Sequence, residues 1–245
     1  MTAEYSPGVD PVVPGAMNFR DVGGLAAGSA RTRSGVLFRS GNLARLDDAG
    51  RGAMAELGIR RIIDLRDEDE VRFAPSLIDG LGIEVQRVPL FLGSVASFFE
   101  EDLSLDQMYA RLLEDSAAGV VDVSRGIIAD QPVLVHCTVG KDRTGVTVAL
   151  TLAAAGVDLD AVVADYARTE TLLPPERNRE VVARLRRLYP DAVNVESLAT
   201  RSPAPAMRAA LERVSEVYGS PADYLRAHGM GDDEVTQLRR ILVAS

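Results

Sequence analysis

The chain is organised around a short apolar run, a polar loop of ten residues and a second apolar run. The first run, residues 132–135, reads Pro-Val-Leu-Val and is typical of a buried strand. The loop, residues 136–145, is followed by the mostly apolar residues 146–152, which favour a helix. Free backbone N–H groups and the helix dipole both point at such a loop, which is where α/β sheets bind anions. Because Gly140 lets the loop curl, its amides can face one centre, and we predict an α/β fold with an anion site here.

The residue types in the loop indicate the chemistry. Cys137 is the only cysteine of the chain, and Lys141 is its only lysine among many arginines. Amides, a helix amino terminus and cations lower the pKa of a cysteine from about 8.5 to between about 3.5 and 7.5, and the thiolate is the nucleophile. Arg143 offers a planar fork to two phosphoryl oxygens, and Thr144 is expected to donate its hydroxyl to the sulfur. The loop therefore predicts transfer of a phosphoryl group to Cys137 and hydrolysis of the resulting cysteinyl phosphate.

These residues resemble the signature loop of the cysteine-dependent protein tyrosine phosphatases. The whole chain is most similar to the bacterial family that includes mycobacterial protein tyrosine phosphatase B. The matching segments are Asn18-Phe19-Arg20-Asp21, Leu37-Phe38-Arg39-Ser40, residues 43–50, Asp64-Leu65-Arg66, Val163-Ala164-Asp165-Tyr166 and Tyr218-Gly219-Ser220. The resemblance implies a central, mostly parallel sheet flanked by helices, with extra C-terminal helices and no metal or other cofactor. It also implies hydrolysis of phosphotyrosine and, in some members, of phosphoserine, phosphothreonine or phosphoinositides.

The resemblance also suggests the other residues of the site. Arg20 is expected to line it, and Asp64 or Arg66, at the end of a predicted strand, is expected to brace the loop. Lys141, whose pairing with Asp142 is similar to the basic loop of lipid phosphatases, is expected to extend recognition. The expected catalytic residues are Cys137, Arg143, Asp142 and Thr144, and the expected substrate-binding residues are His136, Thr138, Val139, Gly140, Lys141, Arg20, Asp64 and Arg66.

The general acid is the one departure from the family pattern. Family members often carry an aspartate after a turn that follows the third strand, and here that position falls at Leu92 or close by. The next carboxylates along the chain are those of Glu100, Glu101 and Asp102. Either one of these or Asp142 protonates the leaving oxygen, and we favour Asp142. Loss of a positioned acid costs about 10²–10⁴ in rate, so the choice decides how fast the enzyme is.

Composition limits the partners and the compartment. A formal net charge of −9 argues against nucleic acid, which requires a basic face. A single cysteine excludes an intramolecular disulfide. Residues 1–15 lack the apolar core of a signal peptide, and residues 146–157 are too short to span a bilayer. We therefore expect a cytoplasmic protein without integral membrane association, which acts on a phosphorylated protein or a phosphoinositide. Export without a cleaved signal would leave no trace in the sequence, and the oligomeric state stays open.

The length and the order of elements favour one domain. Residues 1–16 contain three prolines and are expected to form an extended arm, and residues 17–245 a single phosphatase domain. Strands are expected at residues 36–38, 61–66 and 83–88 in addition to 132–135. Residues 176–189 are expected to form an arginine-rich helix, which is either a solvated helix or a cover that contacts an anionic substrate. Residues 190–204 are expected to be a linker.

Three alternatives remain open. Cys137 could be an ordinary core residue, but this does not explain the Gly-Lys-Asp-Arg-Thr-Gly run beside it. A sulfurtransferase also uses a cysteine in a curled loop, although persulfide chemistry has no need of Arg143 or Asp142. A module that binds phospho-ligands without turning them over is compatible with Leu92, but Cys137, Arg143 and Thr144 argue against it.

Overall fold

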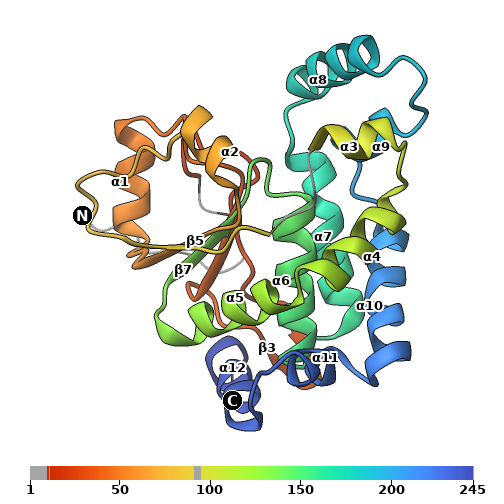
Figure 1. The fold of residues 1–245 in the computed structure, drawn as a ribbon. Coiled ribbons are helices and arrows are strands. Elements are labelled where there is room, and N and C mark those ends of the chain that lie inside the picture. The colour runs from red at the N-terminus through yellow and green to blue at the C-terminus, as the bar shows by residue number, and fades with distance from the viewer. Residues whose placement is uncertain (1–9, 11, 91–94, 245) are drawn as a thin grey trace.

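The structure, a computed structural model, describes residues 10, 12–90 and 95–244 of the chain. Figure 1 shows the fold, with the strands β5 and β7 at the centre of the main sheet. This sheet has five strands in the order β1-β4-β7-β5-β6, and a second sheet pairs β2 with β3. β1 is antiparallel to β4, and the other pairings in the main sheet are parallel. The strands are β1 (Arg20–Asp21), β2 (Ala26–Ala27), β3 (Ala30–Arg31), β4 (Leu37–Ser40), β5 (Arg61–Asp64), β6 (Glu84–Arg87) and β7 (Val133–His136). The predicted sheet, central and mostly parallel, is confirmed.

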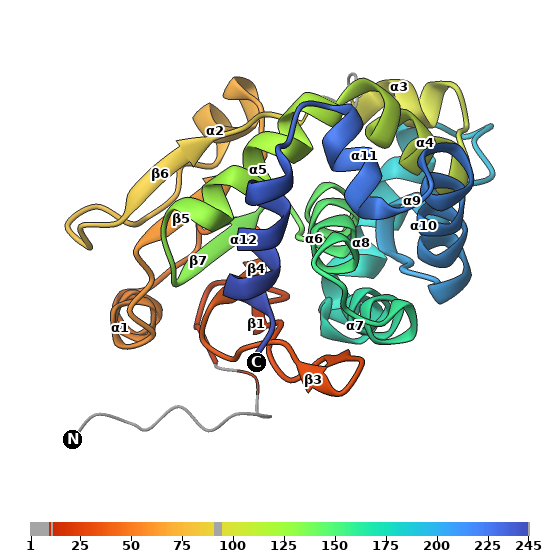
Figure 2. The same cartoon turned by 90° about the horizontal axis from the view of Figure 1, so that it is seen from below.

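Helices flank this sheet and continue beyond it to the C-terminus (Figure 2). They are α1 (Asp48–Glu56), α2 (Glu68–Phe73), α3 (Val95–Glu100), α4 (Leu105–Asp115), α5 (Ala117–Ala129), α6 (Asp142–Ala154), α7 (Leu159–Leu172), α8 (Pro175–Leu188), α9 (Val195–Thr200), α10 (Ala204–Tyr218), α11 (Pro221–Ala227) and α12 (Asp232–Leu242). The extra C-terminal helices are therefore present as expected. The expected linker at residues 190–204 is wrong in part, because α9 forms there and buries Val195 and Leu198, three residues apart on one helix face.

The central strands bury both of their faces. Leu134 of β7 joins a smaller hydrophobic cluster with Met54 of α1. Its neighbours Val133 and Val135 join the larger cluster, which also contains residues of α5 and α6 such as Val120. Successive side chains of a strand point to opposite faces, so this division follows from the apolar run itself.

The parallel strands end level with one another, and this positions the site. In the register of the sheet, His136 at the end of β7 lies between Ser40 of β4 and Asp64 of β5. The segments that follow these three strands therefore begin at the same edge of the sheet. Residues that are far apart in the sequence gather there around Cys137, which follows β7 directly.

Helix α6 supports the loop from the other side. Eleven of its 13 residues are buried, as expected for a helix that is apolar or small on nearly every face. Tyr166 of α7 packs so closely that a Cβ at Gly145 would lie 3.1 Å from its ring. The loop is thus held between a buried strand and a buried helix, both of which restrict its movement.

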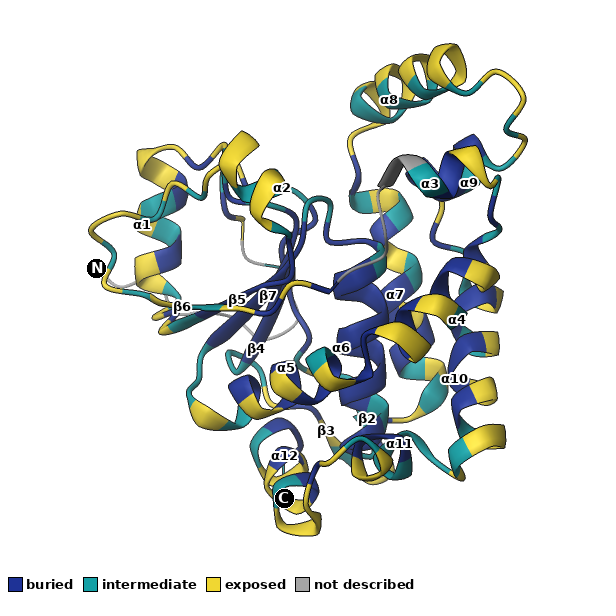
Figure 3. Cartoon of the chain, viewed as in Figure 1, coloured by how far each residue is buried: buried dark blue, intermediate teal, exposed yellow. Residues whose placement is uncertain are grey.

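Helix α8 differs from the others in its exposure. It stands away from the sheet beside α3 and α9 (Figure 1), and none of its 14 residues is buried, as the colours of Figure 3 show. Its half-buried residues, which include Val181 and Leu185, share one face. At its carboxyl end, Tyr189 stacks on Phe99 of α3 with 5.3 Å between ring centroids. The helix therefore packs on α9 and, through the half-buried Val182 and Leu185, against the edge of the larger hydrophobic cluster without being part of it.

Much of the predicted N-terminal arm, residues 1–9 and 11, lies outside the described residues, as does Leu92. Val13 and Ala16, near the end of the arm, are buried in the smaller hydrophobic cluster. Within the described ranges, no helix combines the length and the apolar character needed to cross a bilayer.

Candidate active site

The cysteine sulfur lies inside the curl of the loop. Cys137 is 3 % exposed, and the backbone N–H of Gly140 donates to its Sγ at 3.3 Å. Gly140 has a φ of 74°, which few other residues adopt. A Cβ at this position would lie 2.3 Å from the carbonyl oxygen of Ser40. Position 140 therefore requires glycine both for its backbone angle and for its packing.

The remaining amides of the loop are free to bind an anion. Lys141 precedes the first turn of α6 and provides no side-chain cap. Free N–H groups in a first helical turn are ready donors for phosphoryl oxygens. The loop amides that have no hydrogen-bond acceptor among the described residues are those of Thr138, Val139, Lys141, Asp142 and Arg143.

Three side chains hold the loop by its carbonyl oxygens. Asn18 Nδ2 and Arg39 NH2 each donate to the carbonyl of Gly140 at 2.9 Å. Asn42 Nδ2 donates to the carbonyl of Thr138, also at 2.9 Å. Because these carbonyls are bound on the outside of the loop, its N–H groups stay available on the inside.

A buried ion-pair cluster supports these contacts. Asp165 of α7 accepts from Arg20 Nε and Arg39 NH1, each at 2.8 Å, and all three side chains are almost fully buried. Burial opposes the charge on Asp165, but the neighbouring guanidinium groups lower its pKa overall. Arg20 also donates to Thr169 at 3.0 Å. The prediction that Arg20 lines the site is therefore wrong, because its guanidinium group donates to buried residues and does not line the cavity.

His136, Asp64 and Arg66 also lie behind the loop and do not line the cavity above it. His136 is fully buried, and burial lowers its pKa. Its Nε2 is 3.7 Å from Asp64 Oδ2. Arg66 pairs with Asp64 at 2.8 Å and donates to the carbonyl of Ala74 at 2.7 Å. The Asp64–Arg66 pair thus ties the segment after α2 to the sheet, and it approaches the start of the cysteine loop at His136 without a hydrogen bond to Nε2.

Arg143 is held by a carboxylate that the sequence analysis missed. Glu70 of α2 accepts from NH1 and NH2 of Arg143, both at 2.6 Å, and also accepts from the hydroxyl of Thr138. Burial opposes the charge on Glu70, but the hydrogen bonds and charge of Arg143 lower its pKa to about 2. Nε of Arg143 has no partner among the described residues, and NH2 beside it makes only a long contact, 3.4 Å, to Thr138 Oγ1 in addition to its bond to Glu70. The Nε edge of the fork can therefore take phosphoryl oxygens in place of that contact.

The sequence carried a signal for Glu70, but for a different role. Residues 67–70 are all acidic, which suggests a solvated helix start. Asp67 and Glu70 form a capping box at the start of α2. The same Glu70 side chain then reaches Arg143 across 73 positions of the chain, and local spacing gives no indication of that contact.

Asp142 is the centre of a second hydrogen-bond network. Its Oδ1 accepts from Lys141 Nζ at 2.6 Å and from Tyr109 OH at 2.9 Å. Tyr109 OH is also 2.5 Å from Tyr166 OH. Burial and the charge of Asp142 raise the pKa of Tyr109, so it is a neutral donor. Lys141 Nζ also donates to the carbonyl of Arg201 at 3.0 Å. With the bond to Asp142, this leaves one N–H group of the ammonium for a substrate.

Thr144 and the alternative acids do not make the contacts expected of them. Thr144 Oγ1 is buried and hydrogen-bonds none of the described residues, so the predicted bond to the cysteine sulfur is not formed in this state. Glu101 pairs with Arg111 at the surface, and Asp102 Oδ1 accepts from the backbone N–H of Asn194. Glu100, Glu101 and Asp102 are all missing from the cavity that contains Cys137, whereas Asp142 lines it.

This cavity of about 420 Å³ opens above the loop. Of the expected substrate-binding residues, it brings together Thr138, Val139 and Lys141 with Cys137 and Arg143. Its far walls come from α3, α4, α8 and α9, whose side chains there are mostly apolar. The half-exposed helix α8 covers it, which favours the second of the two predicted roles for residues 176–189.

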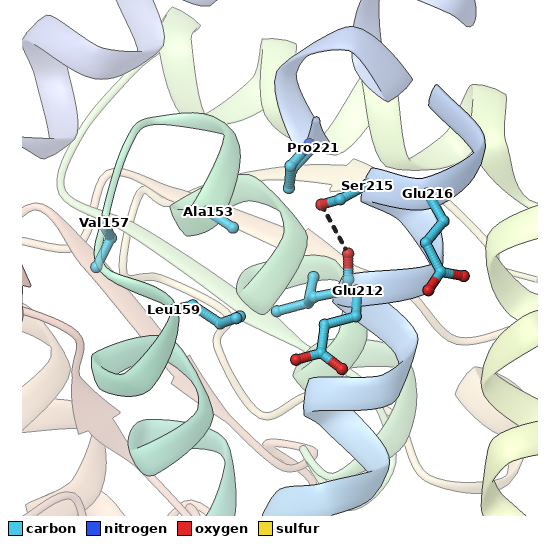
Figure 4. Close-up of a pocket in the computed structure, with 8 residues that line it drawn as sticks. Ala153, Val157, Leu159, Glu212, Ser215, Glu216 and Pro221 are labelled. Atoms are coloured by element: carbon cyan, nitrogen blue, oxygen red, sulfur yellow. Dashed lines mark hydrogen bonds between the residues drawn. The ribbon is translucent and has the colours of Figure 1, made fainter. Parts of the chain in front are cut away.

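A second depression of similar volume lies away from the cysteine (Figure 4). It is lined by the end of α6, the start of α7, one face of α10 and Pro221 at the start of α11. Ser215 there donates to the carbonyl of Leu211 at 3.0 Å, and two carboxylates, of Glu212 and Glu216, lie at its edge. None of the described residues that line it is cationic, so it is unsuited to a phosphate, and the cavity at Cys137 is the candidate site.

Comparison with known proteins agrees with this geometry. The chain belongs to the tyrosine phosphatase family, whose model matches residues 11–244. It is 33 % identical to the triple specificity protein phosphatase PtpB of Mycobacterium tuberculosis, an alignment that covers 94 % of this chain and 98 % of the relative. It is 30 % identical to a tyrosine-protein phosphatase of Nostoc commune, covering 97 % of this chain and 87 % of that protein. The predicted family and enzyme class, a cysteine-dependent phosphatase, are confirmed, and the sulfurtransferase alternative is set aside.

Proposed function

We propose that this protein hydrolyses phosphotyrosine monoesters with Cys137 as nucleophile. The observation that carries the proposal is the position of its sulfur, 3.3 Å from the N–H of Gly140 inside a loop of unoccupied amides, in the same cavity as Arg143. The sulfur attacks phosphorus, an S–P bond forms, and the ester P–O bond breaks. Water then attacks phosphorus, the S–P bond breaks, and inorganic phosphate and the thiolate are released.

The loop amides and Arg143 bind the phosphoryl oxygens. The Nε edge of the guanidinium binds two of them while Glu70 holds the adjacent edge formed by NH1 and NH2. Thr144 Oγ1 acts later. An orphaned buried hydroxyl costs about 1–3 kcal/mol, and a thiolate leaving group gives it an acceptor when the S–P bond breaks.

Substrate choice follows from the walls of the cavity. Phe98, Met108 and Leu198 offer apolar surface to an aromatic ring. The test is a panel of phosphotyrosine, phosphothreonine and phosphoinositide substrates at equal concentration. We expect the highest kcat/KM on phosphotyrosine. Binding of phosphotyrosine without release of phosphate would identify a binding module, and a preference for the inositol lipid would reject the aromatic assignment.

We assign the general acid to Asp142. The support is its place on the cavity wall and the network of Tyr109 and Lys141, which fixes Oδ1 and leaves Oδ2 without a partner among the described residues. Protonated Asp142 gives its proton to the leaving oxygen in the first step, and the carboxylate accepts one from water in the second.

Asp142→Asn is expected to lower kcat by about 10²-fold or more for phenyl phosphate, whose leaving group is poor, and much less for p-nitrophenyl phosphate. A purely structural role would lower both rates alike, so the dependence on the leaving group is the decisive readout. Matched controls are Glu100→Gln, Glu101→Gln and Asp102→Asn, which should keep the activity of the wild type. If one of these loses activity on phenyl phosphate while Asp142→Asn keeps it, the acid is reassigned to that residue.

A further inference from the structure

One face of α8 carries two arginines above the cysteine. Arg177 and Arg184 are seven residues apart, which is two turns of a helix, so they lie on the same face with Val181 between them. All three side chains line the cavity that contains Cys137 and Arg143. The cationic face of this helix is thus directed at the site.

Neither of these guanidinium groups has a carboxylate partner among the described residues. On the same helix, Arg179 and Arg186 pair with Glu176 and Glu196, at 3.8 and 3.2 Å. Arg177 is half-buried, and its one hydrogen bond to the part of the chain that the structure describes goes to Asn178 Oδ1, at 2.9 Å. Its pKa is lowered by burial, and the charge of Asp142 only partly opposes this. A half-buried cation without a counter-ion is unfavourable, and an anion would relieve it.

The carboxylates of the cavity are already engaged elsewhere. Glu70 holds Arg143, and Asp142 holds Lys141. Asp67 accepts from the backbone N–H of Glu70 as the cap of α2. Arg143 and the loop amides bind the phosphoryl group that reacts. The guanidinium groups on α8 are therefore available to bind a second anion.

The wall of the cavity between Arg143 in the loop and the two arginines of α8 is apolar. Leu90, Phe98, Met108, Leu185 and Leu198 line it and provide no side-chain hydrogen bond. An inositol ring would leave its hydroxyls unsatisfied against these walls, whereas an aromatic ring would bury apolar area. The cavity of about 420 Å³ is therefore suited to an aryl group with an anion at each end.

We propose that Arg177 and Arg184 form a second anion site, and that the preferred substrates are aryl phosphates that carry a second anionic group. This rests on the proposed function, in which Cys137 receives the first phosphoryl group. The second anion is either part of a free bis-anionic aryl phosphate or an acidic side chain next to a phosphotyrosine. Both sources present the same chemistry to α8.

The test compares two matched pairs of substrates. One pair is 1,4-phenylene bisphosphate and phenyl phosphate, and the other is a phosphotyrosine peptide flanked by glutamates and the same peptide flanked by glutamines. Wild type should show a lower KM for the first member of at least one pair. Which pair it is identifies the source of the second anion. Arg177→Met and Arg184→Met should each raise that KM about tenfold, with kcat/KM for the mono-anionic member nearly unchanged.

The control is Arg187→Met, a change on the same helix at an exposed residue that does not line the cavity. It should behave as wild type. If wild type does not discriminate within either pair, or if Arg177→Met and Arg184→Met weaken both members equally, the second anion site is rejected. An effect of the two variants confined to inositol polyphosphates would likewise reject the aryl assignment.

Calorimetric binding to Cys137→Ser separates this inference from the proposed function. Tighter binding of the bisphosphate than of phenyl phosphate, lost when Arg177→Met is added, supports the second anion site even if wild type turns over neither compound. Equal binding within both substrate pairs, the two aryl phosphates and the two peptides, rejects the site even if wild type hydrolyses all four compounds.

Discussion

Cys137→Ser is expected to lower kcat on phosphotyrosine by about 10⁴-fold or more, because it removes the atom that forms the covalent intermediate. Serine is close to cysteine in size, so the buried position beside Gly140 keeps its packing. A hydroxyl has a much higher pKa than a thiol, and loop amides that favour a thiolate do not produce an alkoxide at neutral pH. Release of inorganic phosphate by purified protein is the measurement.

Two further measurements make this result specific. The variant should keep the melting temperature of the wild type and bind phosphotyrosine with similar affinity, since the amides and Arg143 are unchanged. After reaction with a substrate whose phosphoryl group is radiolabelled, the label should be trapped on the wild-type protein by rapid acid quench. It should be absent from Cys137→Ser. Turnover at the wild-type rate, or a label retained by the variant, would exclude the covalent mechanism.

The part of the site that is local in sequence could be predicted. Residues 132–152 specify strand, loop and helix by apolar pattern, and Gly140 specifies the curl, because each of these depends on neighbours a few positions away. The level ends of β4, β5 and β7 then follow from parallel pairing. The general position of the anion site can therefore be predicted from the sequence alone.

The contacts between side chains from distant parts of the sequence could not be predicted. Charged residues near strand ends, such as Arg20 and Arg66, can turn toward a site or inward to a buried partner, and the sequence does not distinguish these outcomes. Here Arg20 turns to Asp165, 145 positions away, and Arg66 turns to the segment after α2. The half-burial of Arg177 likewise depends on where α8 lies over the cavity, which helical periodicity does not specify.

The second large effect is expected from Arg143→Lys, which should lower kcat by about 10²–10³-fold while the protein stays folded. Lysine keeps the positive charge, but its donors all lie on one nitrogen and do not form a planar fork. It therefore cannot bind two phosphoryl oxygens and the two oxygens of Glu70 together. Because the lost contacts are strongest in the transition state, kcat should fall more than KM rises. Steady-state kinetics on phenyl phosphate gives both values.

Glu70→Gln tests whether the fork must be held in place. If Glu70 acts by orienting Arg143, its loss should lower kcat by about tenfold alone and add little in the double variant with Arg143→Lys, because there is then no fork to orient. Independent effects would multiply instead, and that result would make Glu70 a contributor in its own right. Glu68→Gln, on the exposed side of the same helical turn, is the matched control and should leave both kcat and KM unchanged.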